Sequence, residues 1–131
     1  MTDATKGNIL FVDDDKFLAD MYSMKFSAAG YTIHTCLSVA EAIAALKAGF
    51  EPDAIVFDLT MPERDGFSLL EEVVKEALAP HAALIALTNA SDPADKERAE
   101  QMGVHRHIVK ASMIPSEVVQ AVGEEIVKRN R

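Results

Sequence analysis

The chain has 131 residues, which is enough for one compact domain and too few for two ordinary ones. Hydrophobic residues make up 49% of it, so a core can form and general disorder is excluded. Thirteen basic residues against twenty-one acidic ones give a formal charge of −8 at pH 7, and this excess of negative charge disfavours direct binding to nucleic acid.

Cysteine content and hydropathy bear on where the protein works. Cys36 is the single cysteine, so an internal disulfide is impossible, as is typical of a reducing compartment. The longest apolar run, 82–87, is far too short to span a membrane. The first six residues lack the hydrophobic core of a signal peptide. We therefore expect a cytoplasmic protein without membrane insertion, with one domain over residues 1–131.

Five short segments have the apolar or β-branched character of strands in a buried sheet. They cover residues 8–13, 31–36, 53–58, 83–88 and 106–110. Four of these segments end in a polar or charged side chain, namely Asp13, Asp58, Thr88 and Lys110. Polar ends on otherwise apolar strands mark the places where the chain leaves the core.

Helical patterns alternate with these segments. The expected helices cover residues 16–29, 38–49, 68–77, 92–103 and a last stretch that begins at 115. Ser38 and Glu41 form a capping box for the second helix, and Ser68 and Glu71 could form another for the third. Asp92 is expected to cap the fourth helix.

The alternation predicts an α/β fold of (βα)5 type, with parallel strands between two layers of helices. Right-handed crossovers favour a doubly wound, flavodoxin-like sheet of strand order 2-1-3-4-5. In such sheets a ligand binds beyond the carboxyl ends of the strands, where the first and third strands flank the reversal of order. We therefore expect the four polar strand ends at one edge of the sheet.

The side chains gathered at this edge constrain the chemistry. Asp13, Asp14 and Asp58 bring three negative charges, and Lys110 returns one positive charge. Carboxylates packed within a few ångströms repel by roughly a few kcal/mol at an effective dielectric of about 20, and a divalent cation would relieve this repulsion. Oxygen ligands without imidazole or thiolate favour Mg²⁺, with Mn²⁺ as an alternative.

Acids, a divalent cation, a lysine and a hydroxyl together indicate phosphoryl transfer. Asp58 is the candidate nucleophile, because it ends the middle strand beside the switch point and an aspartate can form an acyl phosphate. Asp13 and Asp14 would hold the metal together with Asp58 and the backbone carbonyl of Thr60. The phosphoryl oxygens would be held by the two remaining polar strand ends, Thr88 and Lys110.

Four motifs together resemble the receiver domain of two-component response regulators. They are ILFVDDD at 9–15, DLTMPERDG at 58–66, LT at 87–88 and VK at 109–110. The resemblance covers about residues 7–128, and the four motifs are highly specific in this order and at these separations. It implies that a histidine kinase or a histidine phosphotransfer protein phosphorylates Asp58.

The resemblance also implies roles for other residues. Mg²⁺ would bind the three aspartates, and Thr88 and Lys110 would sense the phosphoryl group. His107 occupies the position of an aromatic switch residue, often tyrosine, and an imidazole titrates near neutrality. Family members usually signal through the face formed by the fourth helix, the fifth strand and the fifth helix. The downstream protein target and the oligomeric state stay open.

Two residues depart from the family pattern near the site. Proline usually follows the lysine, often with a cis peptide, whereas Ala111 stands here. A non-proline cis bond costs about 3 kcal/mol, so we expect a trans Lys110–Ala111 bond and an altered loop. The residue after the threonine is usually small, and Asn89 is expected to narrow access to the phosphoryl group.

Neighbouring polar residues have structural interpretations. Asp15 is expected to cap a helix, and Asp65 to shape the turn before Gly66. His105 and His107, two residues apart, would share one face of a strand that includes both. Two histidines without a third ligand are expected to be surface residues rather than a metal site.

The expected function is that of a stand-alone receiver without an output domain, which docks to another protein or passes the phosphoryl group onward. It would catalyse only its own phosphorylation and dephosphorylation, and so is not an enzyme with a separate substrate. One alternative is an interaction module that is never phosphorylated, which Asn89 and Ala111 favour. Another is a phosphatase of the haloacid dehalogenase type. The phosphatase is disfavoured because Thr60 stands in place of its second aspartate and Asp58 does not follow the first strand.

Overall fold

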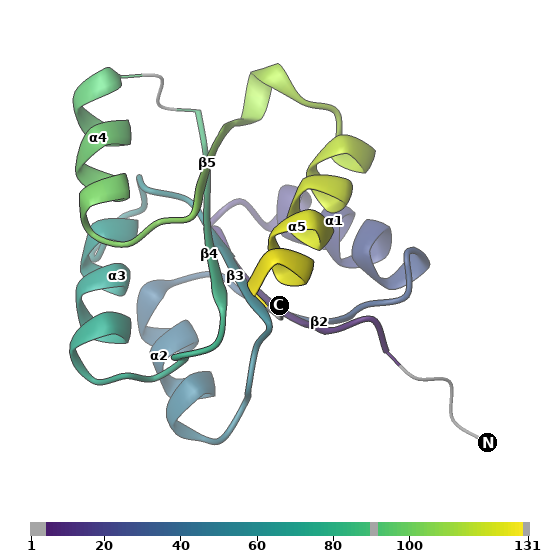
Figure 1. Ribbon diagram of the computed structural model, residues 1–131, viewed down its shortest axis with the longest axis horizontal. Coiled ribbons are helices and arrows are strands. Elements are labelled where there is room, and N and C mark those ends of the chain that lie inside the picture. Colours follow the sequence, from purple (N-terminus) through teal and green to yellow (C-terminus); the bar gives the residue numbers. More distant parts are fainter. Residues whose placement is uncertain (1–4, 90–91, 130–131) are drawn as a thin grey trace.

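The computed structural model describes residues 5–89 and 92–129 (Figure 1). The strands are β1 (Asn8–Val12), β2 (Thr32–Cys36), β3 (Ala54–Phe57), β4 (Ala83–Thr88) and β5 (Arg106–Val109). The helices are α1 (Lys16–Ala28), α2 (Val39–Lys47), α3 (Gly66–Lys75), α4 (Pro93–Gln101) and α5 (Pro115–Arg129), and the 3₁₀ helix η1 covers Lys110–Ser112. Within this described part, none of the helices is long and apolar enough to cross a membrane.

The strands form one parallel sheet in the order β2-β1-β3-β4-β5, which confirms the predicted doubly wound fold. In the ladder, Val12 of β1 pairs with Cys36 of β2 on one side and with Phe57 of β3 on the other. The carboxyl ends of β1 and β3 are therefore level. Asp13 and Asp58, which follow them, become neighbours although they are far apart in sequence.

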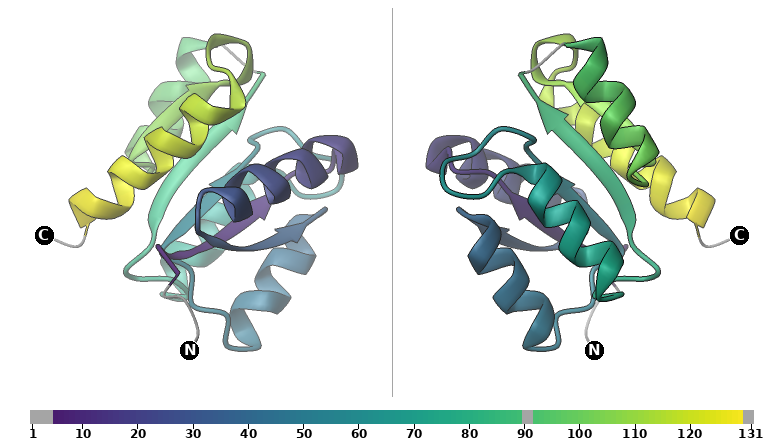
Figure 2. Two further views of the ribbon diagram at one scale, coloured as in Figure 1. Left: turned by 90° about the vertical axis from the view of Figure 1, so that its right-hand side faces the viewer. Right: turned by 90° about the vertical axis from the view of Figure 1, so that its left-hand side faces the viewer.

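Helices cover both faces of the sheet. α2, α3 and α4 lie on one face and α1 and α5 on the other (Figure 1 and Figure 2). Leu10 and Ile55 belong to the core on the α2 and α3 side, whereas Ile9 and Val56 belong to the core on the α1 and α5 side. Because successive strand residues point to opposite faces, both faces of the central strands are apolar, which explains their near-continuous apolar sequences.

Side-chain caps begin most of the helices. α1, α2 and α4 start where the sequence predicts, with caps supplied by Asp15, Ser38 and Asp92. The prediction that Ser68 begins the third helix is wrong. α3 starts at Gly66, and the Asp65 carboxylate accepts a hydrogen bond from the Ser68 N–H at 2.9 Å. The helix starts earlier because Asp65 is itself a strong cap, so Ser68 lies in the first turn.

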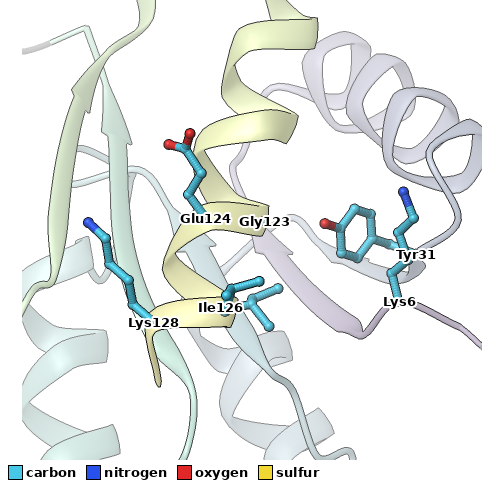
Figure 3. Close-up of a pocket in the computed structure, with 7 residues that line it drawn as sticks. Lys6, Tyr31, Gly123, Glu124, Ile126 and Lys128 are labelled. Carbon is cyan, nitrogen blue, oxygen red and sulfur yellow. The ribbon is translucent and has the colours of Figure 1, made fainter. Parts of the chain in front are cut away.

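A groove lies at the amino ends of the strands, at the opposite edge from the polar strand ends (Figure 3). Lys6, Tyr31 and Ile126 are among the residues that line it. The Tyr31 ring packs edge-on against Phe26, with ring centroids 5.7 Å apart. A Cβ atom at Gly123 would lie 2.5 Å from the Tyr31 hydroxyl, so the glycine permits the close approach of α5 to the chain before β2.

Candidate functional site

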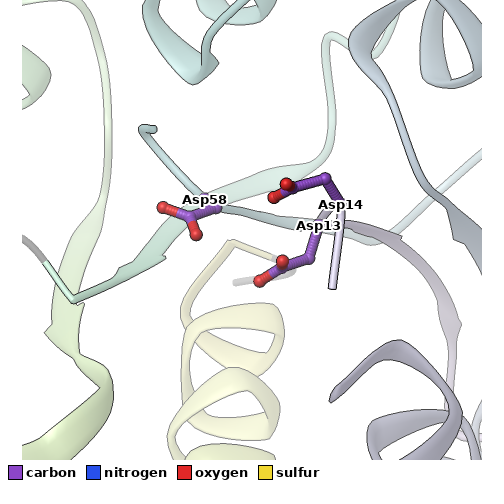
Figure 4. A group of neighbouring side chains, drawn as sticks. All are labelled: Asp13, Asp14 and Asp58. Carbon is purple, nitrogen blue, oxygen red and sulfur yellow. The ribbon is translucent and has the colours of Figure 1, made fainter. Parts of the chain in front are cut away.

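Polar side chains from four strands line one open pocket at the carboxyl edge of the sheet. The strand ends contribute Asp13 after β1, Asp58 after β3, Thr88 at the end of β4 and Lys110 after β5. Asp14, Thr60 and Asn89 also line the pocket. Figure 4 shows Asp13, Asp14 and Asp58 side by side. The structure thus brings together the residues that the sequence assigns to this edge.

The Lys110 ammonium joins the two buried carboxylates. Its Nζ lies 2.7 Å from Asp13 Oδ2 and 2.9 Å from Asp58 Oδ2. Asp13 is 1% exposed and Asp58 is 7% exposed, so both acids are almost withdrawn from water. Removing one partner from a buried ion pair costs about 3–5 kcal/mol, because the other charge is left uncompensated. Lys110 therefore compensates the charge of both acids at this edge of the sheet.

The backbone holds the second oxygen of each carboxylate. Asp13 Oδ1 accepts a hydrogen bond from the Asp15 N–H at 2.9 Å, and Asp58 Oδ1 accepts one from the Thr60 N–H at 3.0 Å. These contacts are turns in which an aspartate bonds the backbone two residues further on. Each acid thus has one oxygen fixed by its own loop and the other by Lys110, which leaves both carboxylates preorganised.

Burial and charge pairing shift the pKa values of this cluster in opposite directions. Burial raises the pKa of Asp13, although hydrogen bonds from Lys110 and Asp15 act to lower it. Burial alone would lower the pKa of Lys110, but hydrogen bonds to Asp13 and Asp58, with their charges, outweigh burial and raise it. Lys110 is therefore a permanent cation at neutral pH.

The acids form a ligand set for a divalent cation. One carboxylate oxygen each from Asp13, Asp14 and Asp58 lies within 4.8 Å of the others. Asp13 and Asp58 are buried, whereas Asp14 is exposed, so solvent reaches the cluster from one side. Several carboxylate oxygens beside water are the donor set that Mg²⁺ prefers, and the residues present fit this ion. That the Thr60 carbonyl is a further ligand stays a prediction.

The loops after β4 and β5 complete the pocket. Thr88 is buried and Asn89 follows it in the pocket wall. Described peptide bonds are trans, so Lys110–Ala111 is trans as expected, and η1 begins at Lys110 itself. Lys110 is therefore held beside the acids without a proline after it.

Gly66 is a positioning residue that sequence analysis missed. A Cβ atom at this position would overlap the backbone carbonyl oxygen of Asp58 and lie 2.8 Å from Leu59 Cα. The Gly66 N–H also donates to the Leu59 carbonyl at 3.1 Å. α3 therefore begins directly against the backbone that carries Asp58. The Asp-Gly pair that ends the Asp58 motif was the available signal, but the same pair is also typical of an ordinary turn.

The remaining polar residues near the pocket cap helices or lie in and beside β5. Asp15 and Asp65 are helix caps, as expected for Asp15. β5 begins at Arg106, so the placement of His105 in that strand is wrong; it is exposed, and its Nδ1 accepts a hydrogen bond from the Leu84 N–H at 2.8 Å. His107 is half-buried on the face of β5 toward α4, and its role as a switch residue stays a prediction.

A family model described as "Response regulator receiver domain" matches residues 9–122. The chain is 31% identical over 105 residues to the "Probable transcriptional regulator ycf27" of Porphyridium aerugineum, and the match covers 80% of this chain and 42% of that protein. It spans less than half the length of the curated relatives that it matches.

Two solved structures have the same fold over almost the whole chain. The receiver domain of the Francisella response regulator 1452 superposes with a TM-score of 0.84 at 26% identity, covering 95% of this chain and 99% of that chain. A CheY-like receiver domain protein from Methanospirillum hungatei JF-1 superposes with a TM-score of 0.86 at 24% identity, covering 94% of this chain and 95% of that one.

We expect Mg²⁺ to raise the thermal unfolding midpoint through the acid cluster. An ion that binds only the folded state adds about 1.4 kcal/mol of stability at ten times its dissociation constant. Asp14→Asn should lose most of this increase with little change in metal-free stability, because Asp14 is exposed. Asp20→Asn, an exposed acid of α1, is the control and should respond like the wild type. Equal Mg²⁺ responses in both variants would contradict the site.

Gly66→Ala should destabilise the fold by about 1–3 kcal/mol in urea unfolding, because the added methyl group overlaps backbone that has little freedom to move. It should also weaken the response to Mg²⁺, since Asp58 is displaced. Glu71→Ala, an exposed change in the same helix, should leave both properties near wild type. A Gly66→Ala protein that keeps wild-type stability and Mg²⁺ response would show that α3 does not position Asp58.

Proposed function

Because the chain belongs to the response regulator receiver domain family, we propose that Asp58 accepts a phosphoryl group from the phosphohistidine of a histidine kinase or a histidine phosphotransfer protein. The observation that carries the proposal is the Asp58 carboxylate, almost buried and paired with Lys110, beside two further acids in an open pocket. Hydrogen bonds from Lys110 and from the Thr60 N–H orient this carboxylate. Solvent reaches the pocket from the side of the exposed Asp14.

The transfer is a displacement at phosphorus. An Asp58 carboxylate oxygen forms the new P–O bond while the P–N bond to the donor imidazole breaks, and the imidazole nitrogen keeps the electron pair. Asp13, Asp14 and Asp58 would hold Mg²⁺, whose charge would neutralise the phosphoryl oxygens. The Lys110 ammonium and the Thr88 hydroxyl line the same pocket and would hold phosphoryl oxygens. Later attack by water restores the carboxylate, so the chain acts on itself rather than on a separate substrate.

Phosphorylation would change the charge balance around Lys110. The Asp58 side chain gains about one negative charge and three acceptor oxygens. Lys110 then has new acceptors that compete with the Asp13 carboxylate it now contacts. Because Lys110 and Thr88 lie at the ends of β5 and β4, their movement would shift the loops toward α4 and α5. A downstream protein would read the face formed by α4, β5 and α5, including His107.

α1 supplies a surface for the phosphodonor. Phe17 is 88% exposed and Met24 is 73% exposed, and Met21 lies half-buried between them. Spacings of four and three residues place these side chains along one stripe of the helix. The stripe begins shortly after Asp14, beside the acceptor pocket. An apolar stripe of this spacing fits a second helix, so we infer that the donor docks a helix here.

Acyl-phosphate formation with a small phosphodonor and Mg²⁺ tests the proposal. Intact-protein mass spectrometry should show the gain of one phosphoryl group, and the gain should need Mg²⁺. Asp58→Asn keeps the side-chain shape without the nucleophilic carboxylate and should gain none. Label retained by Asp58→Asn, or label found on another residue, would refute Asp58 as the acceptor.

The α1 surface predicts a difference between protein and small-molecule donors. Phe17→Ser should slow transfer from a cognate phosphohistidine protein by about tenfold or more, the loss typical of an apolar interface anchor. Its rate with a small phosphodonor should be unchanged. Val74→Ser changes a residue of α3 that is 56% exposed and serves as the matched control. If both variants accept phosphate from the protein donor at the wild-type rate, α1 is not the docking surface.

A further inference from the structure

His107 of β5 faces the helix layer that contains α4. Successive strand residues alternate between faces, and the next residue, Ile108, belongs to the core on the α1 and α5 side. Ala86, which pairs with His107 between β4 and β5, belongs to the core on the other side. Ala99, the buried residue of α4, belongs to that same core. The His107 ring therefore lies between the sheet and α4.

The inner nitrogen of the ring is enclosed without a partner. Among the buried side-chain nitrogens and oxygens of the described residues, His107 Nε2 is the one that lacks a hydrogen bond. A neutral imidazole can leave this nitrogen as a bare acceptor, but an imidazolium carries N–H groups at both nitrogens. A second proton would therefore bury a charged donor with no acceptor, which is strongly unfavourable.

The charges that face the ring come from α4. Burial lowers the pKa of His107, and the Lys96 ammonium lowers it further, whereas Glu100 and Asp95 act in the opposite direction. The preceding residue on β5, Arg106, pairs with acidic side chains of α5 on the other face of the sheet. The net effect of these surroundings favours the neutral ring.

α4 is held to the rest of the molecule by few interactions. Ala99 is its buried side chain, and the Arg98 guanidinium lies 4.0 Å from the centre of the Phe67 ring of α3. None of the ion pairs between described residues joins α4 to another element. α4 packs chiefly against β5, and His107 lies on the face of β5 that α4 covers.

We propose that His107 is a proton-sensitive latch that holds α4 against the sheet when the ring is neutral and releases it when the ring is protonated. The neutral ring fills the space beneath α4 with Nε2 enclosed. The second proton makes Nε2 a donor without an acceptor, so the ring turns toward water and α4 loses a contact on the sheet side. This inference goes beyond phosphorylation and does not depend on it.

The direction of the pH effect follows from the burial of the ring. With α4 docked, the pKa of His107 lies below the ordinary value of about 6.5. The docked position of α4 therefore has its full stability above about pH 6.5. It loses this stability as the pH falls toward the lowered pKa of His107. In that window, undocking of α4 is coupled to the uptake of one proton. The undocked population of α4 therefore rises by up to about tenfold for each pH unit by which the pH falls.

Amide hydrogen exchange of α4, followed by NMR from about pH 7.5 to pH 5, tests the latch together with titration of the His107 ring. After correction for intrinsic exchange rates, the α4 amides of the wild type should exchange faster below about pH 6.5, in step with His107 protonation. His107→Phe keeps a ring that does not titrate, and its α4 opening should not vary with pH. His107→Leu should behave in the same way and covers the case in which phenylalanine packs poorly.

His105→Gln is the matched control, because His105 also has a lowered pKa through burial but contacts β4 and Arg129 rather than α4. This variant should keep the wild-type pH response of α4. The latch is overturned if α4 opens with the same pH dependence in His107→Phe, or if His107 takes up its proton while α4 exchange stays constant. Amide exchange of α4 and titration of His107 are both measured on the unphosphorylated protein, so absence of an acyl phosphate on Asp58 would not affect them.

Discussion

A single ammonium group organises the carboxyl edge of the sheet. Lys110 arrives from β5, at the edge of the sheet, and reaches the acids that follow β1 and β3. Without it, Asp13 and Asp58 would be two buried like charges in a chain that already carries a net charge of −8. The pairing holds both carboxylates in place at this edge. It also connects the loop after β5 directly to the two acids.

Much of the fold follows from patterns that are local in sequence. Apolar runs that stop at Asp13 and Asp58 mark the level ends of adjacent strands, and the parallel topology brings those ends together. The site could therefore be predicted in residue identity, since the side chains at the carboxyl edge are determined by where each strand stops. Which atoms Lys110 contacts was not predictable, because its pairing with carboxylate oxygens depends on distances across three strands.

The features that escaped sequence analysis depend on close approach between elements. Gly66 looks like a turn residue in sequence, and its role arises from the contact between the start of α3 and the Asp58 backbone. Ser68 resembles a helix cap, but Asp65 precedes it and takes that role. The family resemblance places a switch residue at His107, but the enclosure of its Nε2 depends on packing between β5 and α4 and was not predictable.

The central claim is that the carboxyl edge is a divalent-cation site built around Asp58. Anomalous diffraction from crystals of the protein soaked with Mn²⁺, which has the same ligand preference as Mg²⁺, tests it most directly. We predict one strong anomalous peak among the carboxylates of Asp13, Asp14 and Asp58, with the Lys110 ammonium beside it. Ordered crystals with no peak there, or with the ion bound only elsewhere on the acidic surface, would contradict it.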